Sequence, residues 1–123
     1  MGKPNDKQNN NEVVRNGELS PEELQNLKDK LQVKDLFYIE VKMDAEGKDY
    51  ACGYIKPIND RNILATVVGK VAKQDKVGAG EYILANCWAA GDERLRTHNT
   101  ASVSAAIEAL ESVELLESSS KKV

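Results

Sequence analysis

The stretch YILANCWAA, residues 82–90, decides the fold, because its apolar side chains point in every direction when the residues are set on a helix. Glu81 precedes this stretch, and Gly91 follows it as a residue of the type that commonly ends a helix. A helix that is apolar on all sides cannot lie on a protein surface. The pattern therefore predicts a central helix over residues 81–90, surrounded by the rest of the chain, by a second copy or by a partner.

Length and charge exclude several classes of protein. The 123 residues suffice for one domain, and the formal net charge of -3 arises from interspersed lysines and acidic residues without a basic block. Nucleic acid and anionic membrane surfaces are therefore not expected partners. No apolar run approaches the roughly 18 residues of a membrane span, and the N-terminus lacks the apolar core of a signal peptide. We expect a cytoplasmic protein.

Order is expected only between the two ends of the chain. Residues 1–18 are rich in Asn, Lys, Gln and Asp, a composition typical of a disordered N-terminal arm. Residues 117–123 are expected to form a disordered C-terminal tail. The sequence thus predicts a single α+β domain over residues 19–116.

The first helix of this domain is expected over residues 20–32. Ser20 is a favourable N-cap, Pro21 suits the first turn, and Glu23 completes a capping box. The apolar stripe of this helix is narrow and consists of Leu24, Leu27 and Leu31. Such a stripe docks one face of a helix on a neighbouring element.

A change to a two-residue period marks a pair of strands. Apolar and polar residues alternate over residues 37–43, and a second strand-like run covers residues 50–55. Gly47 lies in the turn between them. The pattern predicts a two-stranded antiparallel β-hairpin, which needs helices on its apolar face because a lone hairpin is marginally stable in water.

Two amphipathic helices complete the predicted fold. Asn59 or Asp60 is expected to cap the first, Asn99 or Thr100 to start the second, and residues 74–80 to form a loop before the central helix. The apolar stripes are Ile63, Leu64, Val67, Val68 and Val71 in the first, and Val103, Ala106, Ile107, Leu110 and Val113 in the second. The predicted fold class is α+β: an N-terminal helix, a two-stranded antiparallel β-hairpin, then three helices packed around a central apolar helix. These elements hold enough apolar surface to cover that helix within one chain.

The single histidine does not indicate a metal or catalytic site. His98 lies near Asp92 and Glu93, but the three residues lack regular helical spacing. Arg94 and Arg96 stand between them, where they would repel a cation and can pair with the carboxylates. A solvated loop between helices is the preferred interpretation.

Other candidate chemistry is equally sparse. Cys52 and Cys87 have no cysteine or histidine nearby at metal-ligand spacing, so both are expected to be reduced core residues. Glycines 78 and 80 precede a helix and could favour an anion, but Glu81 follows them and would repel a phosphate, so a hinge or helix start is preferred. We therefore expect no enzyme activity, no cofactor and no metal.

Seven residues are the candidates for binding a partner: Trp88, Asp92, Glu93, Arg94, Arg96, Tyr38 and Tyr54. Trp88 is either a core anchor or the hot spot of an interface. The tyrosines of the hairpin favour cross-strand contacts over a nucleic-acid platform, because no basic groove accompanies them. The partner surface is expected at the hairpin edge, at the loop 92–98 or in the N-terminal arm.

The middle of the chain resembles a family of small phage or prophage proteins, the tail assembly chaperones. The resemblance rests on the hairpin, on the segment YIKP at residues 54–57 with Arg61 shortly after it, and on the segment EYILANCW at residues 81–88, closed by the GDE of residues 91–93. It spans residues 36–113. It implies a non-enzymatic protein that binds a tape-measure protein or another tail component during assembly, through apolar surface.

Two hypotheses from different classes follow. In the first, the chain is an assembly factor that binds a protein partner or associates with itself, through the central helix or the hairpin edge. In the second, it is a small accessory or regulatory domain that binds a small molecule between hairpin and helices. Self-association would make the oligomeric state depend on concentration.

Overall fold

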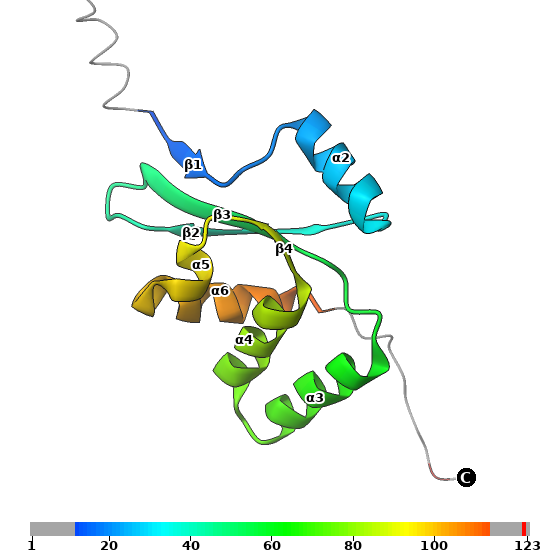
Figure 1. The fold of residues 1–123 in the computed structure, drawn as a ribbon. Helices are drawn as coiled ribbons and strands as arrows, with labels where there is room; N and C mark the ends of the chain where they lie inside the picture. Colours follow the sequence, from blue (N-terminus) through cyan, green and yellow to red (C-terminus); the bar gives the residue numbers. More distant parts are fainter. Residues whose placement is uncertain (1–11, 114–121, 123) are drawn as a thin grey trace, which may run out of the picture.

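A computed structural model of the chain describes residues 12–113 and 122. Five helices and one four-stranded sheet make up the described part, which confirms the mixed α+β class. The sheet lies between α2 (Pro21–Leu31) on its outer face and, on its inner face, the helices α4 (Lys76–Cys87), α5 (Arg94–Thr97) and α6 (Asn99–Glu111) (Figure 1). Helix α3 (Arg61–Ala72) packs against α4, farther from the sheet (Figure 1). Most of the predicted arm and tail lies outside the described residues.

Strand β3 (Asp49–Ile55) is the centre of the sheet. Strand β2 (Phe37–Lys42) pairs with it in antiparallel fashion along one edge. The other edge of β3 is shared by two short strands: β1 (Val14–Asn16) runs parallel to its first half, and β4 (Trp88–Gly91) runs antiparallel to its second half (Figure 1). The sheet thus contains two strands beyond the predicted hairpin.

Strand β1 corrects part of the predicted N-terminal arm. The composition of residues 1–18 predicts disorder, whereas Val14–Asn16 form a strand. The Val14 amide donates to the Lys48 carbonyl at 2.7 Å, and the Asn16 side chain donates to Asp49 Oδ1 at 2.9 Å. The segment is ordered because it adds to a strand that already exists, which needs no apolar cluster of its own.

Helix α4 is shifted relative to the predicted helix over residues 81–90. It begins at Lys76, inside the predicted loop, because Asp75 accepts the amide of Gly78 at 2.9 Å and caps the helix. It ends at Cys87, and Trp88 is already extended, with φ of -60° and ψ of 130°. The last three residues of the predicted helix therefore belong to β4, and Gly91 ends a strand.

Because α4 ends at Cys87, the apolar residues 88–90 pair in the sheet and do not need to be covered as part of a helix. Helix α4 buries one face, made of Ala79, Gly80, Ile83, Leu84 and Cys87. Ala85 and Asn86 on the opposite side are exposed, and the Asn86 side chain donates to the Tyr82 carbonyl at 2.8 Å. Helix α4 is therefore packed on one side and is not surrounded.

The contact between α4 and α6 is unusually close. A Cβ placed on Gly80 would lie 1.8 Å from the carbonyl oxygen of Ala106, closer than any real side chain can approach. The buried face of α6 consists of small residues: Ala101, Ala105, Ala106 and Ala109. Small side chains on both helices let the two backbones come together.

This contact changes only part of the predicted orientation of α6. Of the stripe from Val103 to Val113, Ala106 is fully buried and Leu110 and Val113 pack against the core, as expected. Val103, however, is 42% exposed, and Ala101, Ala105 and Ala109 are buried as well. The cap also differs from prediction, because His98 Nδ1 accepts the Ala101 amide at 3.1 Å in place of a cap by Asn99 or Thr100.

Other local predictions are confirmed by the caps. Ser20 and Glu23 form the capping box of α2, and Asp60, one of two predicted residues, caps α3. Helix α2 contains no buried residue, and α3 buries only Val67. These two helices therefore lie at the periphery, and the core is formed by the sheet with α4 and α6.

The close helix contact makes a sharp prediction about two glycines. Replacing Gly80 with alanine forces the Cβ into the Ala106 backbone and should lower the free energy of unfolding by about 1–3 kcal/mol or more. Gly69 of α3 is the matched control: nothing lies within 4 Å of a Cβ there, so G69A should raise the free energy of unfolding by about 0.5–1 kcal/mol. Urea unfolding measures both, and equal effects of the two variants would contradict the close contact.

Candidate functional site

Arg94 joins three segments of the chain at the start of α5. Its guanidinium pairs with the Asp49 carboxylate of β3 through two hydrogen bonds of 3.1 Å. Its Nε donates to Asp92 Oδ2 at 2.9 Å, and the Asp92 amide donates to the Cys52 carbonyl at 2.8 Å. Asn16 of β1 donates to the same Asp49 carboxylate at 2.9 Å. A two-pronged arginine–carboxylate pair fixes orientation, so this cluster holds β1, β3 and the β4–α5 connection together.

Arg94 also changes the titration of its two acidic partners. Its hydrogen bonds lower the pKa of Asp49 and of Asp92 below the ordinary range of a carboxyl group, against the smaller opposing effect of desolvation. The same contacts raise the pKa of Arg94. Asp92 and Arg94, two of the predicted partner-binding residues, are therefore engaged in stabilising the fold.

Trp88 takes part in the packing of its own chain. Its ring lies across Gly53, so that a Cβ placed on Gly53 would lie 2.7 Å from Trp88 Cη2 and 2.9 Å from Leu95 Cδ1. The Arg96 guanidinium stacks on the ring, 4.5 Å from a ring centroid, and Glu93 pairs with Arg96 at 2.7 Å. Trp88 is half-buried and packs against the core, with Arg96 over its ring. The geometry favours the core-anchor interpretation.

Tyr38 and Tyr54 lie opposite each other on the outer face of the sheet, beside α2. Their ring centroids are 5.4 Å apart, which is an ordinary cross-strand aromatic pair. Tyr54 is only 5% exposed, and its hydroxyl accepts the Leu19 amide at 3.0 Å, which ties the segment before α2 to the sheet. Tyr38 is 42% exposed. Of these two candidates, Tyr38 alone presents substantial surface to a partner.

The hydroxyl of Tyr38 belongs to a polar network on the same face. It lies 2.8 Å from Glu40 Oε1 and 3.0 Å from Cys52 Sγ. Arg15 Nε donates to the same Glu40 oxygen at 3.0 Å. Because burial raises the pKa of the Cys52 thiol and of the Tyr38 hydroxyl, both groups stay protonated. Burial likewise raises the pKa of the Cys87 thiol, and a raised pKa disfavours the nucleophilic thiolate form of both buried cysteines.

Strand β2 provides the long unpaired edge of the described sheet, because it has a neighbour on one side only. The Met43 amide donates to the Asp49 carbonyl at 2.7 Å, so the odd-numbered residues of β2 turn their backbone groups towards β3. The backbone N–H and C=O groups of Tyr38, Glu40 and Lys42 therefore point away from the sheet. Such a row of groups is a template for an added strand.

A groove of about 510 Å³ lies between this edge and α6. It is lined by Glu40, Val41, Lys42, Val103, Ser104, Ile107 and Glu108, and we call it the β2 edge groove. Val103 contributes exposed apolar surface to it. An added strand would thus meet backbone partners on β2 and apolar side chains on α6.

Sequence reasoning predicted a partner surface at the hairpin edge but did not identify these residues. Val103 and Ile107 were assigned to a buried stripe, and Glu40 and Lys42 were taken only as the polar positions of a strand. The available signal was the alanine content of α6, which gives this helix a second possible buried face. Once the alanines are buried, Val103 must be exposed.

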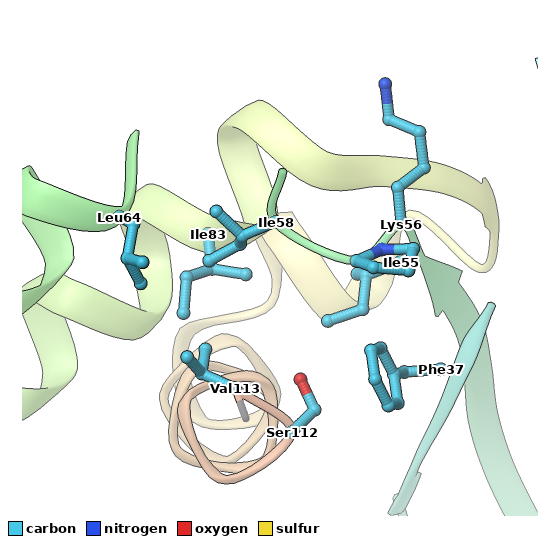
Figure 2. A pocket seen from close by; sticks show the side chains of 9 residues that line it. Phe37, Ile55, Lys56, Ile58, Leu64, Ile83, Ser112 and Val113 are labelled. Carbon is cyan, nitrogen blue, oxygen red and sulfur yellow. The ribbon is translucent and has the colours of Figure 1, made fainter. Parts of the chain in front are cut away.

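A second hollow lies between the hairpin and the helices (Figure 2). It encloses about 220 Å³ and is lined by Phe37, Ile55, Lys56, Pro57, Ile58, Leu64, Ile83, Ser112 and Val113. The Lys56 ammonium points away from the hollow in Figure 2, and Ser112 Oγ donates to the Ala109 carbonyl at 2.6 Å. The lining suits a small apolar molecule but provides few polar groups to orient it.

The described residues show neither a cluster of metal ligands nor a helix suited to span a membrane. Within residues 12–113 and 122, no group of three or more His, Cys, Asp or Glu side chains could hold a metal ion. In this same part of the chain, no helix combines the length and the apolar character needed to cross a membrane.

No protein-family model matches the chain, and no curated protein or solved structure matches it significantly.

The Arg94 cluster predicts how stability depends on pH. The pKa values of Asp49 and Asp92 are lower in the folded protein than in the unfolded chain. Their contribution to the free energy of unfolding is therefore fully present above the ordinary carboxyl pKa of about 4. It is lost as the pH falls through the lower pKa values of the folded protein. The variant R94A should lower the melting temperature at pH 7 and flatten its decline between about pH 4 and pH 2.

Melting curves recorded over this pH range test the prediction. The matched control is R96A, because Arg96 contacts neither of the two carboxylates and pairs with Glu93 instead. This control should retain the acid-dependent decline of the wild type. An R94A profile parallel to that of the wild type would refute the role assigned to Arg94.

Proposed function

We propose that the chain is a non-enzymatic protein-binding factor that acts in assembly in the cytoplasm, similar to the tail assembly chaperones of phages and prophages. Its partner is a tail component such as a tape-measure protein, held as an extended strand along β2. The observation that carries this proposal is the β2 edge groove, where outward-facing backbone groups lie beside exposed apolar surface of α6.

Strand addition accounts for both affinity and selectivity. The main-chain groups of Tyr38, Glu40 and Lys42 supply hydrogen bonds that any extended peptide can accept or donate. Alternate side chains of the added strand would lie over Val103 and Ile107, which favours apolar residues at every second position. The binding of non-native or unassembled protein requires this kind of tolerance.

The other predicted surfaces are less suited to a partner. The apolar face of α4 is closed against α6, and Trp88 and Arg94 are used within the chain. The outer face of the sheet is partly covered by the segment that Tyr54 anchors. The β2 edge groove combines unpaired backbone groups of a strand with exposed apolar groups of α6.

Blocking the edge should abolish binding. Lys42→Pro removes an outward N–H without removing a bond to β3, and proline is tolerated on edge strands. Lys42→Ala removes the same side chain but keeps the backbone donor. On co-expression with a tape-measure protein encoded in the same genome, the wild type and K42A should keep that protein in solution and co-purify with it, whereas K42P should do neither.

Folding is checked separately by circular dichroism and by the melting temperature of each variant. If a folded K42P binds the tape-measure protein as well as K42A does, strand addition at β2 is wrong. If the wild type itself fails to bind, the proposed function is wrong.

A second candidate function is the binding of a small apolar molecule as an accessory or regulatory domain. The observation that favours it is the hollow in Figure 2, whose position between hairpin and helices matches the second hypothesis drawn from the sequence. Its volume of about 220 Å³ is sufficient for a single-ring compound.

Benzene is a suitable probe because apolar cavities of comparable size bind it. It should shift the amide resonances of Phe37, Ile55 and Val113 and raise the melting temperature, and V113W should abolish both effects by filling the hollow. The absence of any shift with benzene near its solubility limit would exclude this candidate.

A further inference from the structure

We propose that a second copy of this chain occupies the β2 edge groove when no partner is bound. The two β2 strands then pair in antiparallel fashion about a two-fold axis, and the two sheets become continuous. This inference rests on the proposed function, because the second copy occupies the same β2 edge that the proposed partner would use.

The charge pattern of β2 favours one register for this pairing. Only the even-numbered residues turn backbone groups outward, so an even-numbered residue must face an even-numbered residue of the other copy. Pairing Glu40 with Glu40, or Lys42 with Lys42, places like charges opposite each other. Pairing Glu40 with Lys42 of the second copy produces two opposite-charge pairs, because the symmetry repeats the contact. We call this arrangement the 40/42 register.

Apolar residues meet on the other face in the same register. Val41, which is half-buried, faces Val41 of the second copy on the two-fold axis, whereas Ile39, opposite Met43, is already buried within its own chain. Val103 and Ile107 of α6 lie beside Val41 in the β2 edge groove, so the exposed surface of both α6 helices is brought to the junction. In the 40/42 register, Glu40 and Lys42 are therefore paired with opposite charges on the outer face, and exposed apolar surface of α6 is covered on the inner face.

Glu40 is held in position for this contact before association. Arg15 and Tyr38 both donate to its Oε1, which leaves Oε2 for the ammonium of the opposite Lys42. About one third of the Glu40 side chain is exposed. A carboxylate fixed in this way loses little conformational freedom when the pair forms.

The first test is the mass of the full chain in solution. Sedimentation and light scattering up to millimolar concentration should show a monomer–dimer equilibrium for the wild type. Lys42→Glu places like charges opposite each other and should raise the dissociation constant at least about tenfold. Lys73→Glu, the same charge change at the C-cap residue that follows α3, should leave this constant unchanged.

The second test probes the 40/42 register itself. E40K and K42E should each be monomeric, since each carries like charges along the edge. An equimolar mixture should form heterodimers, detected by native mass spectrometry, because the reversed charge at position 40 of one variant then faces the reversed charge at position 42 of the other. If E40K does not fold, the dissociation constant of K42E and the amide exchange described next still decide whether the dimer forms through β2.

The third test is amide exchange along β2. The amides of Tyr38, Glu40 and Lys42 should exchange slowly only at concentrations where the dimer forms, whereas those of Ile39 and Val41 should be protected at all concentrations through their bonds to β3. A wild type that stays monomeric, or a K42E that dimerises like the wild type, overturns the inference.

Failure of the dimer and failure of the proposed function give different results. A monomeric wild type that binds the tape-measure protein and loses it in K42P refutes the dimer alone. A dimer that forms as described but never binds the tape-measure protein refutes the proposed function alone.

Discussion

The close crossing of α4 and α6 is the constraint on which the rest of the structure depends. Gly80 lies against the Ala106 carbonyl at a distance that no side chain could occupy, and alanines complete the contact on α6. This choice of small residues decides which face of α6 is buried. It therefore turns Val103 outward, beside β2, and creates the apolar half of the β2 edge groove.

The same helix α4 determines which edge of the sheet stays open. It ends at Cys87, and the chain passes directly into β4, which takes up the second half of one edge of β3. β1 takes up the first half, and Arg94 joins the two regions through Asp49 and Asp92. With that edge occupied, β2 remains as the long accessible strand. The candidate site is thus a result of how the core is arranged.

Local signals in the sequence were sufficient for part of the fold. The capping box at Ser20 and Glu23, the cap at Asp60 and the alternation of β2 depend on residues close together in the chain, and these predictions could be made directly. The α+β class followed from the same patterns. Cys52 and Cys87 are buried, as their apolar surroundings in the sequence indicated.

The remaining features depend on contacts between distant residues. YILANCWAA suits a helix locally, but the free edge of β3 competes for its last residues and pairs Ala90 with Tyr54. β1 is held by partners that are distant in the sequence, such as Asp49 for Asn16 and Glu40 for Arg15. In α6, the face with Val103 and Ile107 competes with the alanine face, and the close contact with Gly80 decides between them. No helical period of α6 alone can reveal this choice.

The divided edge of β3 has a consequence for the size of any assembly. β1 has three residues and β4 has four, and a register shift at Tyr54 and Ile55 interrupts the pairing of β3 with β4. Short, interrupted strands make poor templates for a further strand. Growth of the sheet through β2 would therefore terminate after one addition, and in the described part of the chain no second long edge exists from which a fibre could extend.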